Sequence, residues 1–276
     1  MGRLESRVVL VTGSTGIAAA AAAAAGREGA SVFVVSRDPE HARALAGTVG
    51  GGWSAADLTQ EAEVDAAVGA AVERFGRIDG LFAVAGGSGR RFGDGPLHAL
   101  TADGWDRTLD LNLRTQALTA RAVLRVMLAQ APVGPAPGSR GSIVLVSSVL
   151  AARPVPELFA THAYAAAKGA IVSLATTMAA AYAPDLIRVN VIAPALTATP
   201  MARRAAEDPA TIEFARRKQP LVDGLLDAAD VAAGAIYLLA DEARAVTGQV
   251  LTIDGGWSVT STPAMAGGPA TAGGPG

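Results

Sequence analysis

A tyrosine and a lysine four positions apart are the residues of this sequence best suited to proton transfer. They are Tyr164 and Lys168, in a Tyr-Ala-Ala-Ala-Lys segment. A phenol ordinarily ionises near pH ~10, so it works as an acid or base at neutral pH only when a nearby cation stabilises the phenolate. Residues four apart on a helix lie on one face, about 5 to 6 Å apart at Cβ. The spacing predicts a coupled pair, although a partly buried tyrosine beside a solvated lysine has the same spacing.

A glycine turn close to the N-terminus has the composition of a phosphate-binding loop. It follows an apolar, β-branched run at residues 8–11 and consists of Thr12, Gly13, Ser14, Thr15, Gly16 and Ile17. Glycine permits tight backbone geometry and a close approach to a phosphate, and a helix N-terminus offers free N–H groups with partial positive charge. We expect the pyrophosphate of a dinucleotide to bind here; an ordinary turn between a strand and a helix is the alternative.

The end of the second expected strand bears on the choice of cofactor. A carboxylate there accepts hydrogen bonds from the adenosine ribose and repels a 2′-phosphate, whereas a hydroxyl followed by a guanidinium suits that phosphate. Ser36 and Arg37 therefore favour NADP(H) over NAD(H), unless the next residue, Asp38, points inward. Asp57, after the third expected strand, is expected either to accept from the adenine amino group or to cap the following helix.

Alternating elements along the chain would position these groups. Short apolar runs predict buried strands at residues 8–11, 32–35, 81–84, 143–146, 189–192 and 250–253, with a weaker candidate at 53–56. Helices are expected around residues 15–28, 39–46, 61–75, 102–129, 163–182 and 228–241. This order predicts an α/β fold: a Rossmann-type, doubly wound sheet of about seven parallel strands, flanked by helices on both faces. Ligands would bind at the carboxyl ends of its strands.

Length and composition limit the possibilities further. A chain of 276 residues with 50% hydrophobic content is expected to form one domain, at residues 1–260. The long mixed segment at residues 195–226 suits a mobile substrate lid. Glycine, proline, alanine and threonine dominate residues 261–276, which predicts a disordered tail, and residues 131–140 read as a surface loop.

Charge and residue usage argue against several classes of function. A net charge of -2 provides no basic surface for nucleic acid, and the absence of cysteine excludes thiol catalysis. The three histidines, His41, His98 and His162, lack metal-ligand spacing, so no metal is expected. Alanine is too weakly hydrophobic for the run at residues 18–25 to suggest a membrane span or a secretory signal. We expect a cytoplasmic protein that binds small molecules.

Taken in order, these segments resemble the classical short-chain dehydrogenase/reductases over about residues 5–258. The motifs that carry the resemblance are Thr12-Gly13, Asp57-Leu58, Ala85-Gly86, Leu111-Asn112-Leu113, Ser147-Ser148, the segment from Tyr164 to Lys168, the run from Arg188 to Pro194, Thr247-Gly248-Gln249 and Asp254-Gly255-Gly256. The resemblance implies an NAD(P)-dependent oxidoreductase that transfers a hydride between the nicotinamide and a carbonyl or alcohol substrate.

Residue roles follow from the resemblance. Tyr164 would be the general acid or base, Lys168 would lower its pKa and hold the nicotinamide ribose, and Ser148 would bind the substrate oxygen. Asn112 would anchor a water that relays protons to Lys168. The family further implies cofactor contacts from Leu58, Ala85, Gly86, Pro194, Ala195, Thr197 and Thr199. Without the resemblance, Asn112 could equally be a buried amide that stabilises a turn, and Ser148 a cap at a strand end.

The sequence departs from the family pattern at four places. The glycine turn is one residue short, Ala18 or Ala19 stands in place of its third glycine, and alanine replaces glycine after Pro194. An Ala-Val-Ala-Gly segment at residues 83–86 lacks the usual asparagines, which removes a side-chain bond. Ser148 precedes Tyr164 by sixteen positions instead of about thirteen, which predicts a longer loop beside the substrate.

The substrate cannot be identified from these residues. Arg90, Arg91, His162, Arg203 and Arg204 are expected to rim the pocket, where they would either bind an anionic substrate or be solvated, the second being the more common situation. Residues expected to line the cavity are Glu157, Leu158, Phe159 and Met201.

Two alternative functions are compatible with these motifs. The alternatives are a nucleotide-sugar epimerase or lyase with tightly bound cofactor, slightly favoured by the short turn, and a non-catalytic cofactor sensor. The family also suggests a homotetramer, or a dimer, built on the helices at 102–129 and 163–182.

Overall fold

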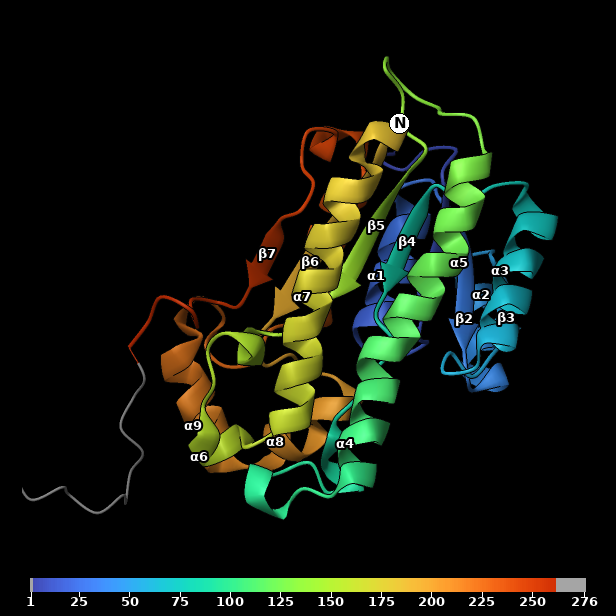
Figure 1. Ribbon diagram of the computed structural model, residues 1–276. Helices are drawn as coiled ribbons and strands as arrows, with labels where there is room; N and C mark the ends of the chain where they lie inside the picture. Colours follow the sequence, from blue (N-terminus) through green and yellow to red (C-terminus); the bar gives the residue numbers. More distant parts are fainter. Residues whose placement is uncertain (1, 262–276) are drawn as a thin grey trace, which may run out of the picture.

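The centre of the molecule is a parallel sheet of seven strands (Figure 1). The computed structural model describes residues 2–261, so the tail predicted at residues 261–276 lies outside the described residues except for its first residue. The strands are β1 (Val8–Thr12), β2 (Ser31–Ser36), β3 (Gly52–Ala55), β4 (Gly80–Ala83), β5 (Gly141–Val146), β6 (Ile187–Pro194) and β7 (Val250–Ile253). Their order is β3-β2-β1-β4-β5-β6-β7. The chain therefore reverses its winding direction at β1, which pairs with both β2 and β4.

Helices cover both faces of this sheet, as the sequence predicted. The face that packs on α3 (Glu61–Phe75), α5 (Thr115–Ala129) and α7 (His162–Tyr182) holds one apolar cluster. The opposite face packs on α1 (Ile17–Arg27), α2 (Pro39–Thr48) and α10 (Ala228–Leu239), around a second cluster. The predicted fold class, a doubly wound α/β sheet, is confirmed.

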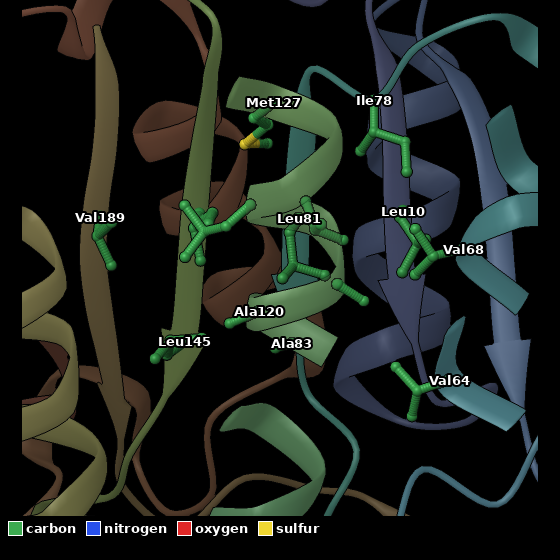
Figure 2. Packing of buried hydrophobic residues seen from close by; sticks show 14 of the residues in the cluster. Leu10, Val64, Val68, Ile78, Leu81, Ala83, Ala120, Met127, Leu145 and Val189 are labelled. Atoms are coloured by element: carbon green, nitrogen blue, oxygen red, sulfur yellow. The ribbon is translucent and has the colours of Figure 1, made fainter. Parts of the chain in front are cut away.

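Successive side chains along each strand point to opposite faces of the sheet, and this alternation produces the two clusters. Leu10 packs toward α3 and α5, whereas its neighbours Val9 and Val11 belong to the opposite cluster. Figure 2 shows the first cluster, in which Leu81 from β4 and Val68 from α3 lie near Leu10. Both faces are covered, so the strands are apolar at nearly every position.

The alanine run forms α1, as its helix propensity predicts. Four of its alanines, Ala18, Ala21, Ala22 and Ala25, are buried, because the small side chain lets the helix lie close to its neighbours. This close packing sets the position of the helix N-terminus relative to the sheet, which matters for the glycine turn described below.

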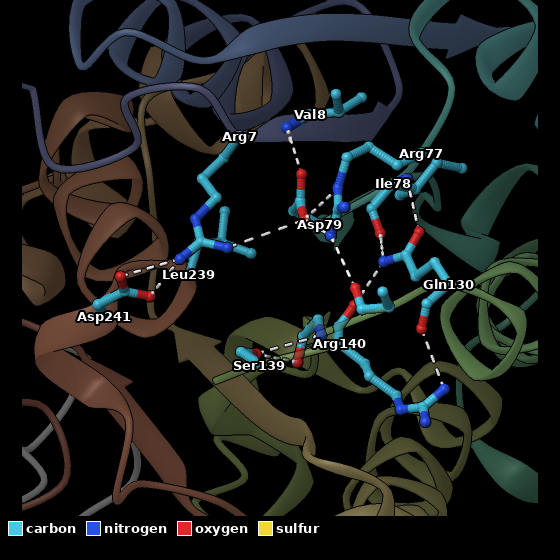
Figure 3. Close-up of polar contacts among 12 residues, drawn as sticks. Arg7, Val8, Arg77, Ile78, Asp79, Gln130, Ser139, Arg140, Leu239 and Asp241 are labelled. Carbon is cyan, nitrogen blue, oxygen red and sulfur yellow. Dashed lines mark hydrogen bonds and ion pairs between the residues drawn. The ribbon is translucent and has the colours of Figure 1, made fainter. Parts of the chain in front are cut away.

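An ion-pair network closes the amino-terminal edge of the sheet (Figure 3). The buried carboxylate of Asp79 accepts from the backbone N–H of Val8 at 3.0 Å and pairs with Arg77 at 2.7 Å. Arg7 lies 3.8 Å from the same carboxylate and also pairs with Asp241 at 2.9 Å. The network ties β1 and β4 to the segment after α10, at the end of the sheet opposite the expected ligands.

One predicted helix contains a π turn. The predicted helix at 102–129 comprises α4 (Ala102–Leu109), a π turn over Asp110–Arg114 and α5, without leaving the helical region. Asn112 lies in this turn, and π turns frequently occur at functional sites.

The segment predicted as a lid is largely helical. It contains α8 (Arg203–Glu207) and α9 (Pro209–Lys218), with single 3₁₀ turns on either side. These helices and α6 (Pro156–Phe159) gather beyond the carboxyl ends of the strands (Figure 1). Within residues 2–261 no helix combines the length and apolar character that crossing a bilayer requires.

Candidate active site

Two neighbouring cavities open at the carboxyl ends of the strands, and Gly86 lines both of them. The first, of about 220 Å³, lies between the ends of β5 and β6, the start of α7 and the segment that carries α8. The second, of about 560 Å³, lies over the ends of β1, β2 and β3. Their arrangement across the point where the winding reverses is the expected place for a dinucleotide. We call them the catalytic cavity and the adenosine cavity.

The four residues predicted to be catalytic all line the catalytic cavity. Ser148 follows the end of β5, Tyr164 and Lys168 lie on one face of α7, and Asn112 comes from the π turn. Residues far apart in the sequence thus meet because β5, the π turn and the start of α7 share one edge of the sheet. The helical spacing of Tyr164 and Lys168 brings the lysine Nζ to 5.5 Å from the centre of the phenol ring.

Lys168 is buried, and its environment weakens its positive charge. Its Nζ donates a hydrogen bond to the carbonyl oxygen of Val146 at 2.9 Å. Burial lowers the pKa of Lys168 from 10.5 to about 7, because the ammonium loses its hydration. Near neutral pH the side chain is therefore close to half protonated, which is unusual for a lysine and typical of functional sites.

The pKa of Tyr164 is shifted in the direction opposite to the sequence prediction. Burial raises the pKa of Tyr164 above 10.0, and the neighbouring Ser148 hydroxyl opposes this rise. Lys168 was expected to lower the pKa, but its Nζ lies over the ring and bonds to the Val146 carbonyl oxygen. Its reduced charge also weakens any stabilisation of the phenolate. The sequence shows the spacing of the pair but not its burial.

Ser148 acts as a cap and Asn112 as a buried amide that holds a turn, as the alternatives to their catalytic roles predicted. Ser148 Oγ accepts from the backbone N–H of Leu150 at 3.2 Å, as a cap. The Asn112 amide donates to the carbonyl oxygens of Gly87 and Thr108 and accepts from the N–H of Gly87. Asn112 therefore holds the loop after β4 against the π turn. This loop includes the residues where the family's asparagines are missing.

Asp94 positions the start of α7, a role that sequence reasoning did not predict. Its buried carboxylate accepts from the backbone N–H groups of Ala163 and Tyr164, both at 2.9 Å. Since α7 has no cap from its own preceding residue, Asp94 supplies the cap from seventy positions away. A carboxylate at a helix N-terminus satisfies free N–H groups and interacts favourably with the helix dipole. Asp94 thus fixes the position of the turn that bears Tyr164.

We expect Asp94→Ala to lower the free energy of unfolding by about 1 to 3 kcal/mol, because two buried N–H groups lose a charged acceptor. Urea denaturation followed by circular dichroism measures this change. Asp103→Ala, on the exposed face of α4, is the control and should change stability by less than about 0.5 kcal/mol. Equal stability of Asp94→Ala and the parent would contradict the assigned cap.

The glycine turn adopts the backbone that glycine permits. Gly13 and Gly16 have φ of 95° and 55°, which disfavour other residues, and α1 begins without a side-chain cap. A Cβ at Gly16 would lie 2.9 Å from the Thr199 side chain, so the segment after β6 packs directly on the turn. The uncapped helix start and the close approach fit a pyrophosphate group.

Two hydroxyls hold this turn in place. Thr12 Oγ1 accepts from the N–H groups of Val84 and Ala85, both at 3.0 Å, and so ties the turn to the loop after β4. Ser14 and Ser36 hydroxyls lie 2.9 Å apart, which joins the turn to the end of β2.

The adenosine cavity is lined by both of the residues that bear on cofactor choice, Arg37 and Asp38. Asp38 caps α2: Oδ1 accepts from the N–H groups of Glu40 and His41, and Oδ2 lies 3.3 Å from the His41 ring. These hydrogen bonds lower the pKa of Asp38. Arg37 has no hydrogen bond or ion pair within residues 2–261. The Asp38 carboxylate therefore caps α2, and the residue also borders the cavity beside Arg37.

Asp57 also lines the adenosine cavity. Its Oδ1 accepts from the N–H and the hydroxyl of Thr59, which lowers the pKa of Asp57. Asp57 closes the turn before α3, but the N-cap residue of that helix is Gln60.

Most of the predicted cofactor residues line one of the two cavities. Gly13, Ser14, Thr15, Ser36, Arg37, Asp57, Leu58, Ala85 and Gly86 border the adenosine cavity, and Ile17, Gly86, Tyr164, Lys168, Pro194, Ala195, Thr197 and Thr199 border the catalytic one. Thr12 and Gly16 border neither, and act through the backbone geometry described above.

The predicted rim and wall residues separate into two groups. Phe159, Met201, Arg90 and Arg204 line the catalytic cavity, whereas Glu157, Leu158, His162 and Arg203 do not, and Arg91 lines the other one. The loop before Tyr164 directs Phe159 into the cavity wall, because Val155 and Phe159 pack with Phe214 on Trp257. Sequence reasoning missed Trp257, whose indole Nε1 is buried without a hydrogen-bond partner in the described part of the chain.

Comparisons with known proteins show which family the chain resembles. A family model described as enoyl-(acyl carrier protein) reductase matches residues 11–258. Momilactone A synthase from Oryza sativa subsp. japonica is 36% identical over 274 residues, covering 94% of this chain and 93% of that protein. Levodione reductase from Leifsonia aquatica is 34% identical over 276 residues, covering 93% and 96%. The structure of a short-chain type dehydrogenase/reductase from Mycobacterium ulcerans superposes with a TM-score of 0.84 at 30% identity, covering 96% and 94%.

Proposed function

Because this chain belongs to the short-chain dehydrogenase/reductase family, we propose that it is an NAD(P)-dependent oxidoreductase that interconverts an alcohol and a carbonyl compound. The observation that carries this proposal is the meeting of Ser148, Tyr164 and Lys168 in one cavity that adjoins a second, dinucleotide-sized space. The substrate is a small molecule.

The chain's own residues would manage the proton. In reduction, Tyr164 donates its hydroxyl proton to the carbonyl oxygen, and in oxidation its phenolate takes the proton of the alcohol. Ser148 donates a hydrogen bond to the same oxygen, where negative charge develops. The bound nicotinamide supplies or accepts the hydride. Lys168 would hold the nicotinamide ribose, and Asn112 would anchor a relay water, while its side chain keeps the loop after β4 in place.

Hydride transfer is tested with a panel of ketones, aldehydes and alcohols, assayed with NADPH, NADH and their oxidised forms. We expect a net change in nicotinamide absorbance with at least one carbonyl compound. A nucleotide-sugar epimerase or lyase would give product without net change in absorbance, and a non-catalytic sensor would bind cofactor without turnover. The family relationship and the intact proton-transfer residues support the oxidoreductase over both.

A preference for NADP(H) is supported by Arg37, which lines the adenosine cavity without a hydrogen bond or ion pair to another described residue, and by the use of the Asp38 carboxylate as the cap of α2. We expect Arg37→Ala to weaken NADPH binding roughly tenfold or more, because a charged hydrogen bond to the 2′-phosphate is lost, and to leave NADH binding nearly unchanged. Fluorescence titration of each reduced cofactor measures both affinities. Equal losses for the two cofactors would refute the phosphate assignment.

The proposal also includes a substrate lid and an oligomeric assembly. Residues 195–226 would act as the substrate lid, since Thr197, Thr199 and Met201 line the catalytic cavity. A homotetramer built through α5 and α7, or a dimer, would form in the cytoplasm, and light scattering after size-exclusion chromatography determines the assembly.

A further inference from the structure

We propose that the substrate is an apolar ketone or alcohol that carries a carboxylate, and that Arg90 and Arg204 bind this carboxylate at the mouth of the catalytic cavity. The inference deepens the oxidoreductase function proposed above and rests on it. It specifies a chemical class of substrate from the charges, contacts and walls of the cavity.

The charge balance of the cavity lining is one-sided. Three cationic side chains line it, Arg90, Lys168 and Arg204, and no aspartate or glutamate does. Lys168 lies at the buried end beside Tyr164. The two arginines are exposed and come from different segments that line the cavity: the loop after β4 for Arg90, and α8 for Arg204. A ligand between them meets positive charge from both.

The two guanidinium groups retain free hydrogen-bonding capacity. Arg90 donates through Nη2 to the carbonyl oxygen of Leu158 at 3.0 Å, which orients it, and makes no ion pair within residues 2–261. Arg204 has no hydrogen bond or ion pair to any described residue. Both arginines line the same cavity. Burial lowers the pKa of Arg90, the positive charge of Arg204 lowers it further, and the nearby carboxylate of Asp94 offsets part of this lowering. A carboxylate between them would relieve the repulsion between the two positive charges and accept charge-assisted hydrogen bonds.

The arginine adjacent to each of these residues behaves differently. Arg203 forms an ion pair with Glu207 at 3.9 Å and stays outside the cavity lining. Arg91 packs over the Phe92 ring at 4.5 Å and lines the adenosine cavity. Only one member of each pair therefore faces the substrate space, a distinction that only the fold makes.

The walls between the arginines and Tyr164 are apolar. They are formed by Val149, Leu150, Phe159, Leu196, Met201 and Trp257. Such walls favour a hydrocarbon body, and a polar group placed against them would lose its hydration. A carboxylate is favoured over a phosphate monoester because it has less charge to desolvate beside these apolar walls. The proposed substrate thus has its carbonyl at Ser148 and Tyr164, an apolar middle and an anionic end.

Turnover of methyl-ketone acids of increasing chain length, from acetoacetate upward, tests the proposal beside their methyl esters and dihydroxyacetone phosphate. For an acid of fitting length we expect KM to be roughly tenfold lower than for its ester. Arg90→Met and Arg204→Met should each remove this difference by raising KM for the acid to that for the ester. Arg203→Met is the matched control and should behave as the parent. Affinity for NADPH is measured in all variants, because a role in cofactor binding would change it.

A second measurement does not depend on turnover. Ligand-observed NMR compares hexanoate with hexanol for binding to the parent protein and to the same variants. We expect hexanoate to bind more tightly, and each of the two arginine substitutions to abolish the difference.

Equal binding of acid and alcohol, or tightest binding of the phosphate compound, would overturn the carboxylate assignment. Loss of NADPH affinity without loss of acid preference would do the same. If neutral ketones are turned over without any preference for acids, the inference fails and the oxidoreductase function stands; failure of every carbonyl compound with both cofactors would instead refute the function.

Discussion

Replacing Tyr164 by phenylalanine is expected to lower kcat about a hundred- to ten-thousand-fold, because the substitution removes only the hydroxyl that transfers the proton. The ring stays in place, so the apolar packing at the start of α7 is kept. NADPH should still bind with similar affinity, since the remaining cofactor contacts are unchanged. Steady-state absorbance assays and fluorescence titration of NADPH measure the two quantities separately.

A matched control lies on the same helix. Tyr182 ends α7, is partly buried like Tyr164, and lines neither cavity. Tyr182→Phe should therefore keep the parental kcat, within about twofold. Turnover by Tyr164→Phe at the parental rate would show that another group moves the proton, and the proposed mechanism would be wrong.

Replacing Lys168 by methionine is expected to remove activity and to stabilise the fold at neutral pH. The pKa of Lys168 is about 7 in the folded protein and 10.5 in the reference state. Because the folded pKa lies below the unfolded one, the unfolded chain binds more protons between these values, and the free energy of unfolding rises with pH across that window. Below pH 7 both states are protonated and the cost of the buried charge is present in full.

The expected size follows from this linkage. At pH 7 and below, Lys168→Met should raise the free energy of unfolding by about 2 to 4 kcal/mol, after allowance for the lost hydrogen bond to Val146. The gain should shrink as pH rises and vanish near pH ~10.5. Urea denaturation at a series of pH values measures the slope. Lys218, the only other lysine, provides the comparison. Burial lowers the pKa of Lys218 too, but we expect Lys218→Met to leave the neutral-pH part of the slope nearly as in the parent.

If Lys168→Met were less stable than the parent at pH 6, the burial of a charged ammonium would be the wrong description. The same pair of variants separates function from stability: both Tyr164→Phe and Lys168→Met should be inactive, but only the lysine substitution should change the pH dependence of unfolding. A site that sacrifices stability for a buried cation is expected where that cation serves binding or catalysis.

The sequence by itself determined the strands, the helices that pack on the sheet and the fold class of this protein. Its signals are local: apolar runs such as residues 143–146, the alanine run of α1, and the four-residue spacing of Tyr164 and Lys168. The glycine turn was also predictable, because positive φ at Gly13 and Gly16 is a property of residue type. Such features depend on neighbours in the chain and can be read from their order.

The tertiary structure alone decided which distant groups meet. Asp94 caps α7 from another loop, Thr12 supports the loop after β4, and Trp257 closes the catalytic cavity, yet none has a local signal. The choice of Arg90 and Arg204 over their adjacent arginines depends on how each segment is oriented against the sheet. The raised pKa of Tyr164 has the same origin, because the removal of water by packing, a long-range effect, outweighs the charge of a neighbour four residues away.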